Sequence, residues 1–112
     1  MSNGRRRATI ARLNDQFRES SGNGWVFLSQ RVGALPAPTA AEIINAVCVF
    51  DAFTPDNDPF GEHDCAVLTI GEHSIVWKID YYRDKRSGHG DADPADPTTT
   101  LRALTIMLAE EY

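Results

Sequence analysis

The sequence predicts an α+β protein with a small, mainly antiparallel three-stranded sheet and about three helices, in the order α-β-α-β-β-α. Three observations indicate this class. Apolar residues recur at helical spacing in three segments, helix-capping signals precede two of them, and two alternating segments flank a glycine turn. The 112 residues are the size of one domain, so we expect a single domain over 1–112.

The first half of the chain predicts two helices with a strand between them. A helix is expected over residues 5–20, because its apolar residues fall on one narrow stripe. The segment 25–28 is short, aromatic and β-branched, which predicts a strand. A second helix is expected over 39–50, where Thr39 and Glu42 have the spacing of a capping box.

The second half predicts a β-hairpin and a final helix. Residues 65–70 and 74–82 flank the turn, and the alternation of the second strand predicts which side chains face the core: Ile75, Trp77, Ile79 and Tyr81. A broadly apolar helix is expected over 96–112. Asp96 would cap it and Pro97 would occupy its first position, where no amide hydrogen is needed.

Composition limits the classes of function. The formal net charge of −5 disfavours general affinity for nucleic acid. The N-terminal arginines are followed by no apolar signal-peptide core, and no apolar run approaches the roughly 20 residues of a membrane span. We therefore expect a cytoplasmic protein in which Cys48 and Cys65 stay reduced and no cofactor is bound.

The acid-rich loop 51–64 is the first candidate site. Asp56 and Asp58 are two residues apart and Gly61 is sixth, as in a calcium loop, but Phe60 and Val67 break the pattern. Hard cations prefer clustered oxygen ligands, so a looser metal site is an alternative. Its candidate ligands are Asp56, Asp58, Glu62, His63 and Asp64.

The same loop has two other interpretations. Asp and Asn side chains bond to nearby backbone amides while proline fixes φ, so one interpretation of the loop is a rigid connection between helix and hairpin. It is also a candidate surface for a protein partner. The acidic residues of that candidate surface are Asp51, Asp56, Asp58, Glu62 and Asp64.

Two further patterns bear on function. His63 and Cys65 would share one face of a strand, which allows a Cys–His pair but assigns no third orienting group. The basic and aromatic residues of 81–86, with the arginine-rich first helix, resemble a single-strand binder. Trp25 and Trp77 are expected in the core rather than on a binding platform.

The chain resembles domain-of-unknown-function family 3768, a family of small bacterial proteins. The segments that carry this resemblance are FDAFTPDNDP (50–59), GEHD (61–64), WKIDYY (77–82) and DPADP (93–97) leading into LTIMLA (104–109). The sequence departs from the family pattern at Phe60 and Cys65. The resemblance implies accessory or mobile-element biology and assigns no catalytic residue.

These observations favour a non-catalytic protein-interaction module, with counter-defence as the sharpest form of that role. The partner would be another protein. No catalytic residue and no cofactor-binding residue is assigned. The alternatives are a metal-dependent enzyme using the acidic 56–64 loop and a nucleic-acid-binding accessory protein.

Overall fold

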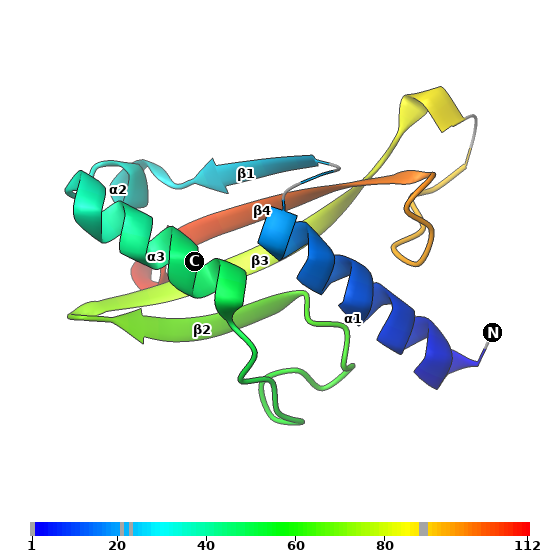
Figure 1. Ribbon diagram of the computed structural model, residues 1–112, viewed down its shortest axis with the longest axis horizontal. Helices are drawn as coiled ribbons and strands as arrows, with labels where there is room; N and C mark the ends of the chain where they lie inside the picture. Colours follow the sequence, from blue (N-terminus) through cyan, green and yellow to red (C-terminus); the bar gives the residue numbers. More distant parts are fainter. Residues whose placement is uncertain (1, 21, 23, 88–89) are drawn as a thin grey trace.

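The computed structural model describes residues 2–20, 22, 24–87 and 90–112 (Figure 1). Three helices and a four-stranded mixed sheet confirm the α+β class. The elements in chain order are α1 (Asn3–Ser20), β1 (Gly24–Leu28), α2 (Gln30–Gly33), α3 (Ala37–Val49), β2 (Cys65–Ile70), β3 (His73–Arg83), the 3₁₀ turn η1 (Lys85–Ser87), β4 (Thr100–Leu108) and the 3₁₀ turn η2 (Ala109–Glu111).

The sheet has the order β1-β4-β3-β2. β2 and β3 form the predicted antiparallel hairpin, and β3 pairs antiparallel with β4. β1 pairs with β4 in parallel, with Gly24 opposite Arg102 and Leu28 opposite Ile106. The predicted sheet, mainly antiparallel with three strands, was therefore wrong in strand number; the sheet is mixed, with β1 as its one parallel strand among the described residues.

The predicted final helix over 96–112 was wrong, because residues 100–108 form the central strand β4. Most side chains of β4 are buried on both faces of the sheet. A continuous apolar run is compatible with both a central strand and a buried helix, so the periodicity of the sequence could not distinguish them. Asp96 does accept a hydrogen bond from the Thr98 amide at 2.9 Å, but this contact closes a turn before the strand.

The first half of the chain followed its prediction closely. α1 and β1 lie where they were expected. α3 begins at Ala37 with Pro36 as its N-cap residue and no side-chain cap bond, so the expected capping box at Thr39 was wrong. Proline near the start of a helix removes an amide hydrogen that has no partner there, which replaces the need for such a cap.

α1 and α3 cover one face of the sheet (Figure 1). The strand residues beneath them were predicted correctly for β3, where Ile75, Trp77 and Ile79 are buried and Tyr81 is partly buried. No helix of the described residues lies on the opposite face. Among those residues, no helix is long and apolar enough to cross a membrane.

Candidate functional site

The acidic loop between α3 and β2 is held by its own side chains. The Thr54 amide donates to Asn57 Oδ1 at 2.8 Å, and Asn57 Nδ2 donates to the Ala52 carbonyl at 3.0 Å. The Asp58 amide donates to the Thr54 carbonyl at 2.8 Å. These are the turn-forming contacts expected of Asn and Asp next to proline, so the loop carries the self-bonding that the second interpretation requires.

Asp58 turns inward and fixes the end of the loop. Its side chain is 5% exposed, and Oδ1 accepts a hydrogen bond from the His63 amide at 3.3 Å. His63 has a φ of 56°, a left-handed conformation that is uncommon for residues other than glycine. Its imidazole stacks on Phe53, with 3.9 Å between ring centroids and 4° between planes.

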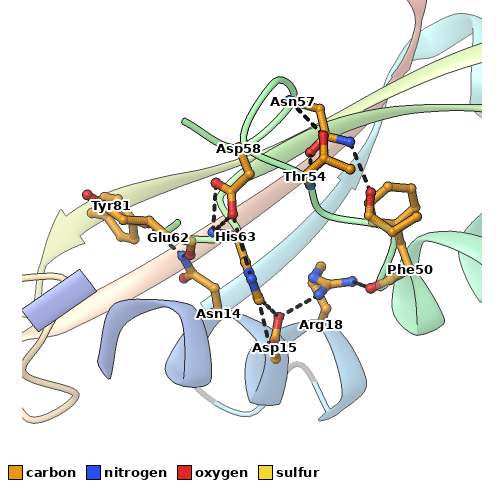
Figure 2. A network of polar contacts seen from close by, with 11 residues as sticks. Asn14, Asp15, Arg18, Phe50, Thr54, Asn57, Asp58, Glu62, His63 and Tyr81 are labelled. Atoms are coloured by element: carbon orange, nitrogen blue, oxygen red, sulfur yellow. Dashed lines mark hydrogen bonds and ion pairs between the residues drawn. The ribbon is translucent and has the colours of Figure 1, made fainter. Parts of the chain in front are cut away.

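The His63 ring joins the loop to α1, as Figure 2 shows. Nδ1 lies 2.9 Å from Asp15 Oδ1, and on the other side Nε2 lies 3.6 Å from Asp58 Oδ2. Asp15 Oδ1 also accepts a hydrogen bond from Arg18 Nη2 at 2.7 Å. The imidazole is thus placed between two carboxylates, one from the helix and one from its own loop.

Arg18 extends this network to the end of α3. Its side chain is almost completely buried, and Nη1 donates to the carbonyls of Val47 at 2.8 Å and Phe50 at 2.9 Å. Carbonyls at a helix C-terminus lack helical partners and favour a nearby cation. The guanidinium also lies 4.7 Å from the centroid of the Trp77 ring, a cation–π contact.

A second polar branch reaches the sheet through Asn14. Asn14 Nδ2 donates to the Glu62 carbonyl at 3.0 Å and to the Tyr81 hydroxyl at 2.9 Å. Asn14 Oδ1 accepts from Arg102 Nε at 2.7 Å. Burial raises the pKa of Tyr81 to about 12 and lowers the pKa of Arg102.

The His63 ring has two carboxylate partners and an aromatic one, and among the described residues no hydrogen bond joins it to Cys65. β2 begins at Cys65, so the strand alternation that would have allowed a Cys–His pair does not extend to His63, whose ring bonds to Asp15 instead. Burial and the nearby Asp64 charge raise the pKa of the Cys65 thiol, which disfavours the reactive thiolate. The network therefore joins α1, α3, the loop and the sheet.

The predicted acidic residues do not converge. Asp51 and Asp56 are exposed, Asp58 faces His63, and Glu62 and Asp64 are partly buried. Burial and the Asp64 charge raise the pKa of Glu62. Within 2–20, 22, 24–87 and 90–112, no group of three or more His, Cys, Asp or Glu side chains is placed to hold a metal ion.

Sequence reasoning missed an apolar surface at the β1 edge. The four apolar side chains of β1 are exposed: Trp25 47%, Val26 38%, Phe27 51% and Leu28 36%. The expected core position of Trp25 was wrong, whereas Trp77 is fully buried. The signal was present as a run of four large apolar residues without charge, which predicts a strand equally well at an edge or in the centre.

A hollow of about 760 Å³ adjoins this edge on the face of the sheet that the helices leave uncovered. Its apolar wall is formed by Trp25, Phe27, Tyr82 and Leu101, and its rim by residues 83–85. The Trp25 and Tyr82 rings meet edge to face, with centroids 6.3 Å apart. We call the four exposed residues of β1 and this hollow the apolar edge.

Comparison with known proteins gives a family for most of this fold. A family-wide pattern described as "Protein of unknown function (DUF3768)" matches residues 28–111. The chain belongs to this family. The matched segment of this DUF3768 member begins at the last residue of β1, so it includes His63 and Arg102 but not Asp15 or Trp25. No curated protein and no solved structure matches the chain.

Proposed function

We propose that this chain is a non-catalytic protein-interaction module and that it binds its partner at the apolar edge. The observation that carries this proposal is the exposure of all four large apolar side chains of β1. Edge strands present unpaired backbone groups, and proteins usually protect them with charge, proline or a covering element. Gly24–Leu28 contains no charged residue and no proline.

Strand addition is the binding mode that fits this edge. In that mode, the backbone of an incoming extended segment pairs with the free side of an edge strand, and alternate side chains fill neighbouring pockets. The hollow beside Trp25 and Phe27 would receive one such side chain. The acidic loop 51–64 is a less favourable surface, because Asp58 is buried and only part of its charge faces solvent.

The finer biological role rests on the family resemblance. We place the module in the bacterial cytoplasm and in mobile-element or accessory biology, with counter-defence as its sharpest form. The two free thiols, Cys48 and Cys65, support a reducing compartment. In such a setting the partner would be a protein chain with an accessible extended segment.

The proposal is tested by introducing a charge into the edge strand. The tagged chain and its Val26→Lys variant would be used to capture partners from a bacterial lysate by cross-linking. Val67→Lys is the matched control, since Val67 is an exposed apolar residue on the opposite edge strand, β2. Partners retained by Val67→Lys and lost from Val26→Lys would support the proposal. Equal capture by all three proteins would overturn it.

Single-stranded nucleic acid is the second candidate ligand, and the hollow is the observation that favours it. Aromatic rings stack on bases, and the aromatic wall of the hollow lies beside the segment 83–86. This segment contains three cationic residues and one acidic residue, Asp84. Asp84 is itself engaged by Arg86, with Nη2 and Oδ2 2.9 Å apart. The segment therefore offers net positive charge beside the aromatic wall.

Fluorescence anisotropy with a labelled oligothymidine of about 15 nucleotides tests this second candidate, since single-strand sites span several nucleotides. Affinity that falls steeply with salt and is lost in Lys85→Glu, but not in Arg12→Glu on α1, would support nucleic-acid binding. Absence of binding at low salt would exclude it.

A further inference from the structure

The backbone of β1 shows which of its residues are available to another strand. The Ser29 amide donates to the Ile106 carbonyl of β4 at 2.9 Å. Because peptide groups along a strand alternate in direction, Trp25 and Phe27 direct their backbone groups toward β4 in the same way. Gly24, Val26 and Leu28 consequently direct theirs away from the sheet, toward the free edge.

The outward-directed backbone groups of β1 can pair with those of a second β1. If two copies of β1 pair antiparallel about Val26, each Val26 faces Val26 of the other copy and each Gly24 faces Leu28 of the other. All of these are the outward-directed residues, so each pair can exchange both backbone hydrogen bonds. On the helix-covered side, a glycine opposite a leucine leaves room for the larger side chain.

The positions between these residues, Trp25 and Phe27, also form favourable pairs in this register. In this register Trp25 faces Phe27 of the second copy, at the non-hydrogen-bonded positions where opposite side chains approach most closely. Aromatic pairs at such positions are among the favourable cross-strand contacts. Both rings are about half exposed in the single chain, so pairing would remove them from water.

Charge does not oppose this pairing. β1 carries no charged side chain, and Arg31 nearby in α2 is paired with Glu110 at 2.8 Å. The acidic loop leads into β2, at the opposite edge of the sheet (Figure 1). The net charge of −5 is therefore not concentrated where the two copies would meet.

The area available sets the strength of the contact. A large aromatic side chain presents roughly 150–250 Å², so the half-exposed Trp25 and Phe27 offer about 100 Å² each. Val26 and Leu28 add smaller amounts. A standard interface buries about 800 Å² per partner, so the strand contact alone is smaller than that of a permanent dimer. The expected association is reversible and concentration-dependent.

We infer that the occupant of the free β1 edge is a second copy of this chain, paired antiparallel about Val26 to join two sheets into one. This inference rests on the proposed function, because it names the partner that the apolar edge receives. It also gives each chain a composite surface, since the Trp25 and Phe27 walls of two hollows would meet at the junction.

The register is tested by disulfide trapping. In a background with Cys48→Ala and Cys65→Ala, Val26→Cys would form a cross-linked dimer under mild oxidation, because the two positions face each other. Val67→Cys on β2 is the matched control and is expected to remain monomeric. If Val26→Cys cross-links no faster than Val67→Cys, the antiparallel register about Val26 is wrong.

Sedimentation equilibrium up to about 1 mM protein tests the association itself, a range that covers weak interfaces. The unmodified chain should dimerise with increasing concentration, and Val26→Lys should raise the dissociation constant at least about tenfold, since like charges would face each other. A strictly monomeric chain would overturn the inference. If the chain is monomeric but lysate partners still depend on Val26, the apolar edge binds a different protein and the proposed interaction module holds. If the chain is monomeric and no lysate partner depends on Val26, both proposals are wrong.

Discussion

His63 Nδ1 lies 2.9 Å from Asp15 Oδ1, and this contact ties the loop before β2 to the middle of α1. The same ring faces Asp58 on its other side and stacks on Phe53. The backbone of His63 is left-handed, with a φ of 56°. A side chain that is held by three neighbours can maintain a backbone conformation that is unfavourable by itself.

Substitution of His63 separates the side-chain contacts from the backbone strain. His63→Asn and His63→Val both lose the Asp15 and Phe53 contacts, and each should lower the free energy of unfolding by about 1–3 kcal/mol. Asn tolerates a positive φ and a β-branched residue does not, so Val should cost about 1 kcal/mol more. Urea denaturation measures the difference. Equal stability of the two variants would show that the loop relaxes.

Removal of the Arg18 guanidinium should be strongly destabilising. Arg18→Leu leaves the Val47 and Phe50 carbonyls without this donor and Asp15 without its cation, for an expected loss of about 2–4 kcal/mol. Arg12→Leu is the control, because Arg12 is exposed on the same helix and should change stability by less than about 0.5 kcal/mol. Thermal and urea unfolding of both variants gives the comparison.

A methyl group at Gly24 should displace β1 from β4. A Cβ atom there would lie 1.7 Å from the Arg102 carbonyl oxygen, which is a backbone atom and does not move without shifting the strand. Gly24→Ala should therefore cost about 2 kcal/mol or more. Gly4→Ala in α1 meets nothing within 4 Å and should be neutral or stabilising by up to about 1 kcal/mol. A stable Gly24→Ala protein would contradict the close β1–β4 approach.

Tyr81 should ionise at a higher pH than an unburied tyrosine, because burial disfavours the charged phenolate and raises its pKa. The folded pKa of about 12 lies above the ordinary value of 10, so the folded state retains a proton that the unfolded state has lost between these pH values. Stability from this group is complete below pH 10 and falls as the pH rises from 10 to 12. The slope is at most about 1.4 kcal/mol per pH unit.

Spectrophotometric titration of the tyrosinates and urea denaturation across this pH range measure both effects. Tyr81→Phe should remove the late ionisation and flatten the stability profile relative to the unmodified chain. Tyr82→Phe is the control, because Tyr82 is exposed, and it should leave the late ionisation in place. Ionisation of Tyr81 at the ordinary pKa value of 10 would show that the hydroxyl is open to solvent.

Local sequence determined the elements whose patterns are local. The α1 stripe, the hairpin around Gly71 and the Asn and Asp turn contacts of the 51–64 loop were predicted from neighbouring residues. Gly71 adopts a φ of 58° at the tight turn, where a residue without Cβ is favoured. Such signals need only a few consecutive residues to be read.

Tertiary structure decided what depends on distant partners. Residues 100–108 are a strand because β1 and β3 flank them, and an apolar run alone is compatible with a helix or a strand. His63 meets Asp15 across 48 residues of chain, and no spacing within the loop encodes that contact. Trp25 is exposed rather than buried because its strand lies at an edge. The sequence alone thus determined which residues are apolar, whereas sheet order determined which of them face water, because burial depends on neighbours that the chain brings together only on folding.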